Sequence, residues 1–141
     1  MTPEEEALHA VAEALDDLSV PYMLTGSVAA SYHGRPRATH DTDLVIGKID
    51  LIIRRDRPFS REEMGRRLRA DLGGRSVAIV TPEDSVLSKL EWARRAGDSE
   101  RQLADAAGVL AVNPSLDRAY VEHWARELGV CDLWHRIAGQ G

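Results

Sequence analysis

The segment 26–47, GSVAASYHGRPRATHDTDLVIG, decides the fold of this 141-residue chain. It begins with Gly26 and Ser27 and, after thirteen further residues, reaches Asp41 and Asp43, which one residue separates. The apolar run after Asp43 predicts a strand, and residues at positions i and i+2 of a strand point to the same face. Two carboxylates on one face repel each other and contribute nothing to folding, so the arrangement predicts a bound cation.

Magnesium is the cation that fits this pattern. Proteins hold this hard ion with one or two carboxylates together with substrate phosphates, and two such ions side by side are typical of displacement at phosphorus. Gly26 lets the backbone approach a phosphate closely, and Ser27 adds a hydroxyl donor at the start of an expected short helix. Arg35 and Arg37, on the loop that follows, would complete the neutralisation. A solvated strand end or an ordinary turn explains either motif alone, but the two in this order favour a site for nucleotide phosphates and two Mg²⁺ ions.

The elements around this segment follow from hydrophobic periodicity and from capping residues. Before residue 81 the expected order is a helix over 2–18, a strand over 22–26, a helix over 27–33, strands over 41–46 and 48–55, a helix from Ser60 to about Gly73 and Gly74, and a strand over 75–80. After it, only helices are expected, over 81–96, 99–112 and 115–128, with a short one ending near residue 137. Trp92, Trp124 and Trp134 occur at spacings typical of helix packing and are expected in the core.

This order predicts an α+β fold. A small mixed β-sheet flanked by helices, forming a core over residues 1–80, would be followed by a C-terminal helical subdomain over 81–141. No apolar run approaches the ~18 residues that cross a bilayer, so no membrane contact is expected. The acidic N-terminus is unlike a signal peptide, and the single cysteine, Cys131, excludes an internal disulfide. We therefore expect a cytoplasmic protein.

The charge of the chain is distributed unevenly. Between Arg54 and Arg75 there are eight arginines and four carboxylates, which give a local charge of +4. Because the net charge of the chain is −5, the other residues together carry −9. Such a segment is able to hold a polyanion through phosphate contacts, which favours RNA as a partner. The alternative is an ordinary solvated helix face.

The pair Gly26–Ser27, followed by Asp41-x-Asp43 and an apolar residue, resembles the signature of the DNA polymerase β-like nucleotidyltransferase superfamily. Within it, Lys48-Ile49-Asp50 looks like the Lys-x-Asp strand of the abortive-infection (AbiEii-type) nucleotidyltransferases. Lys89 and Asp105 match the later lysine and acidic positions of that group as residues, although the spacing around them is loose. The resemblance extends from residue 22 to about residue 112.

The resemblance implies transfer of a nucleoside monophosphate from an NTP to an acceptor hydroxyl, with release of pyrophosphate. In that mechanism Gly26 and Ser27 hold the β- and γ-phosphates. Asp41 and Asp43 bind both magnesium ions, while Asp50 ligates one of them and helps to deprotonate the acceptor. The acceptor would be RNA, with tRNA favoured because toxin members of such families act on it, or a protein hydroxyl. The family also implies a toxin–antitoxin pair with a neutralising partner protein.

Two residues of the helical half have competing interpretations. Lys89 would balance the charge of the triphosphate, but a solvated helix lysine explains it equally well. Asp105 follows Arg101 by four residues, so a helix-stabilising ion pair accounts for it. His33 and His40 flank the loop after the Gly-Ser motif, where a local structural role is the simpler interpretation.

The chain departs from the family pattern between Asp43 and Asp50, where only six residues intervene. One continuous strand would separate the two acids by about 23 Å and place them on opposite faces. A tight turn at Gly47 and Lys48 would bring them onto one face, about 7–8 Å apart. We favour a third alternative, a further segment of chain between Gly47 and Lys48. If the short connection is real, the rival function is a non-catalytic module of the same fold that binds nucleotide, RNA or a partner protein.

Overall fold

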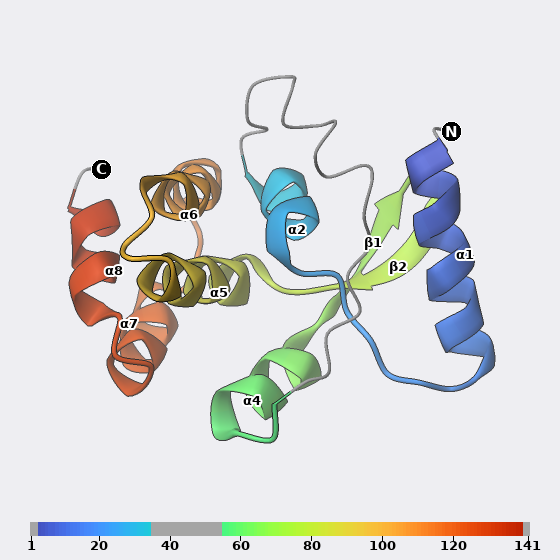
Figure 1. Cartoon of the computed structure of the whole chain (residues 1–141), viewed down its shortest axis with the longest axis horizontal. Coiled ribbons are helices and arrows are strands. Elements are labelled where there is room, and N and C mark those ends of the chain that lie inside the picture. Colours follow the sequence, from blue (N-terminus) through green and yellow to red (C-terminus); the bar gives the residue numbers. More distant parts are fainter. Residues whose placement is uncertain (1–2, 35–54, 140–141) are drawn as a thin grey trace. The chain divides into compact units, whose positions relative to one another are not determined.

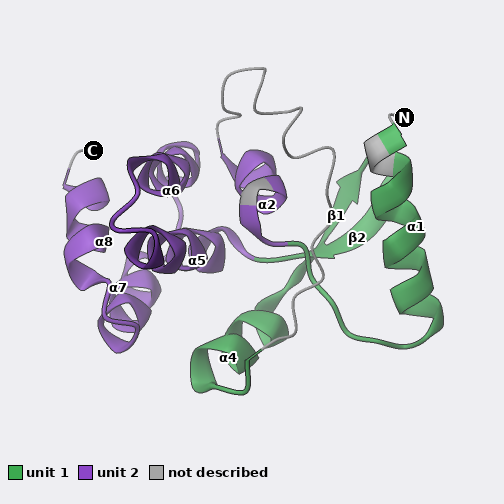
Figure 2. Cartoon of the chain, in the orientation of Figure 1, with its two compact units in different colours: residues 1–24, 38–80 green, residues 25–37, 81–141 purple. Residues whose placement is uncertain are grey.

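The computed structural model describes residues 3–34 and 55–139, which fall into two compact units (Figures 1 and 2). The first unit comprises residues 1–24 and 38–80, and the second comprises residues 25–37 and 81–141. Helices and a two-stranded antiparallel sheet make up the described part, so the predicted α+β class is confirmed. The strand expected over 41–46, and nearly all of the one over 48–55, lie outside the described residues.

The first unit begins with helix α1, Pro3–Asp17, as its sequence predicts. This helix packs against strand β2, Arg75–Ile79. The buried His9 donates a hydrogen bond from Nε2 to the carbonyl of Leu72 at 2.5 Å. Oε2 of Glu13 forms a salt bridge with Nη1 of Arg75 at 3.1 Å. Both contacts fall on residues that flank the turn of the hairpin, so α1 is tied to that turn.

The helix expected from Ser60 to Gly73 is wrong in its second half. Helix α4, Pro58–Arg66, ends early, and strand β1, Leu68–Leu72, follows it and pairs with β2. Gly73 and Gly74 have φ values of +60° and +82°, the left-handed conformations that a tight two-residue hairpin turn requires. The glycine pair therefore connects two strands and does not end a helix.

The strand expected over 22–26 is reduced to one bridge. Leu24 pairs in parallel with Ile79, donating its N–H to the carbonyl of Ala78 at 2.8 Å and accepting from the N–H of Val80 at 2.9 Å. Together with the antiparallel hairpin, this bridge gives the described part of the first unit both pairing directions, as the predicted mixed sheet requires.

The second unit is helical. It consists of α2, Gly26–His33, α5, Pro82–Arg95, α6, Glu100–Val112, α7, Arg118–Glu127, and α8, Cys131–Ala138. The side chains of Thr81, Ser99 and Asp117 accept hydrogen bonds from the first turns of α5, α6 and α7, which fixes where these helices begin. The helices expected over 81–96 and 99–112 are confirmed, and α7 begins three residues later than expected because Asp117 is its cap.

The three tryptophans of this unit differ in exposure. Trp134 is 3% exposed and belongs to the core, as predicted. Trp92 is 48% exposed, so its assignment to the core is wrong; its ring lies 5.5 Å from the guanidinium carbon of Arg95. Trp124 is half-buried. In the described part of the chain, no helix combines the length and the apolarity that crossing a membrane demands.

Candidate functional site

Gly26 and Ser27 are the first two residues of α2. The preceding Thr25 is extended, with φ −144°, and its side chain makes no capping hydrogen bond. Gly26 has φ +69°, and a Cβ added there would meet nothing within 4 Å, so the backbone conformation, and not crowding, requires a glycine at this position. The first N–H groups of a helix have no partners within the helix, and an anion is one group that satisfies them.

The other end of α2 is fixed against α6. The side-chain amide of Asn113 donates to the carbonyl of His33 at 2.6 Å and to that of Val109 at 2.7 Å, so one residue joins the ends of both helices. A Cβ on Gly34 would lie 2.9 Å from the backbone nitrogen of Val109 and 2.8 Å from the carbonyl oxygen of Ala30. The close approach of the chain to α6 therefore requires glycine, and it holds α2 in place.

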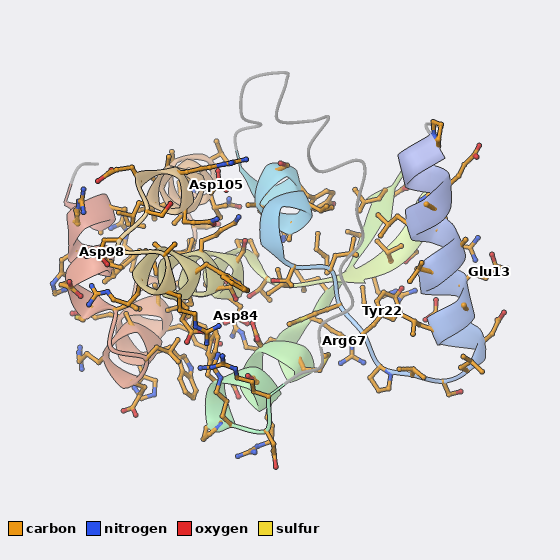
Figure 3. All side chains as sticks on the ribbon, viewed as in Figure 1. Glu13, Tyr22, Arg67, Asp84, Asp98 and Asp105 are labelled. Carbon is orange, nitrogen blue, oxygen red and sulfur yellow. The ribbon has the colours of Figure 1, made fainter. Side chains whose placement is uncertain are left out.

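Lys89 lies inside the second unit, on α5. It is 3% exposed, so the alternative of a solvated helix lysine is wrong. Its Nζ lies 2.9 Å from Oδ2 of Asp105 and 3.1 Å from Oε1 of Gln102, both on α6. Asp105 is itself only 8% exposed, and its carboxylate lies between α5 and α6 (Figure 3). A buried charge is costly unless it is paired, so each of these two residues requires the other.

A second buried carboxylate, which is not one of the predicted site residues, lies at the start of α5. Asp84 is fully buried; its Oδ1 accepts from the hydroxyl of Tyr120 at 2.6 Å, and its N–H donates to the hydroxyl of Thr81. A negative charge in the first turn of a helix is favoured by the helix dipole. The capping residue Thr81 was the signal that could have located it. This contact joins α5 to α7 and serves the packing of the unit.

Five of the predicted site residues, Arg35, Arg37, Asp41, Asp43 and Asp50, lie outside the described residues, and so does the side chain of Ser27. Among the residues that are described, no group of three or more histidine, cysteine, aspartate or glutamate side chains is arranged to hold a metal ion. The magnesium site therefore stays a prediction, as do the roles of these residues.

Two features of the site are on the described residues: the opening of α2 at Gly26 and the buried pair of Lys89 and Asp105. They come from sequence positions far apart, and both belong to the second unit, in which α2 packs against α5 and α6. In comparisons with known proteins, no family model, no curated protein and no solved structure matches this chain.

Proposed function

We propose that this protein is a metal-dependent nucleotidyltransferase that moves a nucleoside monophosphate from an NTP to an acceptor hydroxyl. The observation that carries the proposal is the Gly26–Ser27 pair at the start of α2, with the positive φ of Gly26, which thirteen residues separate from Asp41-x-Asp43. Helix N-termini bind phosphate because their N–H groups point outward and the helix dipole favours negative charge. Paired carboxylates after such a helix suit displacement at phosphorus.

In the proposed reaction the acceptor oxygen forms a bond to the α-phosphorus, and the bond from that phosphorus to the bridging oxygen breaks. Pyrophosphate leaves, and the hydroxyl proton goes to the carboxylate of Asp50. The N–H groups at the start of α2 hold the β- and γ-phosphates throughout. Asp41, Asp43 and Asp50 would hold two Mg²⁺ ions, which supply neutralisation of the phosphate charge when bound.

The proposed contact of Lys89 with the triphosphate depends on its ion pair with Asp105. Its ammonium group already lies 2.9 Å from a carboxylate oxygen of Asp105, so the pair presents little net charge to a ligand. Lys89 would contribute a full positive charge only if its ammonium group moved away from Asp105. The simpler contribution of the pair is to fix α5 against α6, on which α2 packs.

The test is transfer of label from each of the four α-labelled NTPs, with Mg²⁺, to total RNA and to protein. The native chain should transfer label, and the double variant Asp41→Asn, Asp43→Asn should not. The double variant Asp16→Asn, Asp17→Asn makes the same chemical change on exposed positions at the end of α1 and should transfer label normally. Equal labelling by the native chain and the first double variant would refute the proposal.

The paired state of Lys89 also favours a second candidate, a non-catalytic module of the same fold. Under that alternative no label is transferred in any reaction. The nucleotide, RNA or partner protein that the module binds still raises the melting temperature of the native chain. If neither labelling nor a shift in melting temperature occurs with any NTP, the nucleotidyltransferase proposal fails, and so does a module that binds nucleotide.

A further inference from the structure

The arginines of the segment 55–75 differ in what their guanidinium groups contact. Arg61 lies 2.5 Å from Oδ1 of Asp56, and Arg75 lies 3.1 Å from Oε2 of Glu13. These two positive charges are compensated by carboxylates in the same unit. Because an incoming phosphate would have to compete with those carboxylates, neither arginine is well suited to hold it.

Arg67 and Arg69 have a different environment. Nη1 of Arg67 donates to the carbonyl of Met64 at 2.7 Å, while Arg69 donates from Nε to the hydroxyl of Ser76 at 3.2 Å and from Nη2 to its carbonyl at 3.4 Å. Both side chains are exposed. Within the described ranges, 3–34 and 55–139, both guanidinium groups bond only to uncharged acceptors, which orient them without cancelling their charge.

The backbone places these two charges on one face. Arg67, at the end of α4, has φ −52° and ψ 147°, an extended conformation that leads directly into β1 (Figure 3). Residues two apart on an extended chain point the same way and lie about 6.6 Å apart along it. The two arginine side chains thus leave the backbone on one face, at the junction of α4 and the hairpin, and together they are called the positive row.

One acidic residue opposes this row. Asp71 follows Arg69 by two residues in β1, pairs across the hairpin with Ser76 and is exposed on the same face. Its charge weakens the attraction of the positive row for an anion. Among the described residues, however, Asp71 forms no ion pair with either arginine of the row. Removing that charge should therefore strengthen binding, which gives the surface a test of opposite sign.

We propose that Arg67 and Arg69 form a docking surface for the phosphate backbone of single-stranded RNA. The choice of RNA rests on the proposed function, because RNA carries the free hydroxyl groups that an acceptor needs. Guanidinium groups suit phosphate oxygens through charge-assisted hydrogen bonds, and two of them in a row contact a chain of phosphates without reading its bases. The surface binds RNA without regard to sequence and holds the acceptor strand on the first unit.

The experiment measures binding of a fluorescent single-stranded RNA by anisotropy, with neither NTP nor Mg²⁺, over a series of KCl concentrations. The double variant Arg67→Gln, Arg69→Gln should lower the affinity about tenfold and reduce the salt slope of log K by about 1.4, the value for two lost phosphate contacts on a single strand. The double variant Arg67→Lys, Arg69→Lys should retain most of the affinity, because lysine keeps the charge. Arg61→Gln is the matched control, and it should leave both quantities nearly unchanged.

Asp71→Asn should raise the affinity. Circular dichroism and melting temperature establish that each variant is folded, and Asp71→Asn keeps the test valid if the glutamine variant is not. The proposal is overturned if the glutamine variant binds like the native chain, if Arg61→Gln weakens binding as much, or if Asp71→Asn leaves the affinity unchanged. Because binding is measured without NTP, its failure leaves the labelling test of the proposed function unaffected, and a failed labelling test leaves the salt slopes unaffected.

Discussion

Lys89 and Asp105 form a buried ion pair that no spacing in the sequence reveals. They lie sixteen residues apart on different helices, and each alone is consistent with a solvated helix face. Only the packing of α5 against α6 brings the ammonium and the carboxylate together at 2.9 Å. Helical periodicity predicts which face of a helix is buried, but it does not predict which residue of another helix that face meets.

Removing one member of this pair should be more harmful than removing both. Lys89→Met or Asp105→Leu alone leaves an unpaired buried charge and should lower the free energy of unfolding by about 3–5 kcal/mol, whereas the double variant should be close to native. Urea unfolding measures all three. Arg136→Gln, which breaks an exposed pair with Glu100, is the control and should cost less than about 1 kcal/mol. Additive losses in the double variant would contradict the assignment.

Gly34 follows α2 at a point where the chain lies close to the backbone of α6. Gly34→Ala places a Cβ 2.9 Å from the backbone nitrogen of Val109 and should destabilise the protein by about 1–3 kcal/mol, because backbone must move. Gly65→Ala is the matched control: it stands in α4, where an added Cβ meets nothing within 4 Å, so it should be neutral or stabilise by up to about 1 kcal/mol. Equal melting temperatures for the two variants would show that α2 and α6 are not held together at Gly34.

Among the elements, the helices that follow Thr81 and Ser99 were predicted well, whereas those expected from Ser60 and Ser115 begin instead at Pro58 and Arg118. Thr81 and Ser99 both cap as predicted, because a cap is a local interaction that is visible in the sequence. The hairpin was missed because the basic residues after Arg66 continue the composition of α4. Its signal was present in Gly73 and Gly74, a pair that favours a two-residue hairpin turn between two strands.

The contact between α5 and α8 should make the stability of the fold depend on pH. A hydrogen bond from Arg94 lowers the pKa of Asp132 below its usual 3.8, and the same bond raises the pKa of Arg94. A lowered carboxyl pKa in the folded state stabilises the fold above the unfolded pKa, and the effect is lost as pH falls through the folded value. Arg94→Gln should therefore lower the melting temperature slightly at pH 5 to 7, and the difference should shrink as pH falls below about 3.8.

Two measurements check this interpretation. Because both side chains are exposed, added salt should reduce the difference between native and variant at neutral pH. Arg95→Gln, at the neighbouring position, has no carboxylate partner among the described residues and should show no such pH dependence. A difference for Arg94→Gln that stayed constant in acid and in high salt would show that the ion pair does not stabilise the fold.

The two units do not follow the order of the chain. Helix α2 groups with residues 81–141, although about 50 residues separate them in the sequence. Composition changes at residue 81, where the chain becomes entirely helical, and that change was readable from the sequence. The packing of α2 on α5 and α6 could not be predicted from the sequence. A helix of eight residues has too short a hydrophobic pattern to indicate which elements cover it.

This grouping predicts that residues 81–141 alone lack part of their core. In α2, Ala29 is fully buried and Ala30 is nearly so, and the helix packs on both α5 and α6. A fragment of residues 81–141 should therefore unfold in less urea, and less cooperatively, than one in which residues 25–34 precede it through a Gly/Ser linker of about ten residues. The linked fragment should be more stable by at least about 2 kcal/mol, since it covers the apolar faces of both helices. Ala29→Glu in the linked fragment keeps its length but prevents packing, so it should abolish the gain. If the short fragment were as stable as the linked one, α2 would not be part of the folding unit formed by the C-terminal helices.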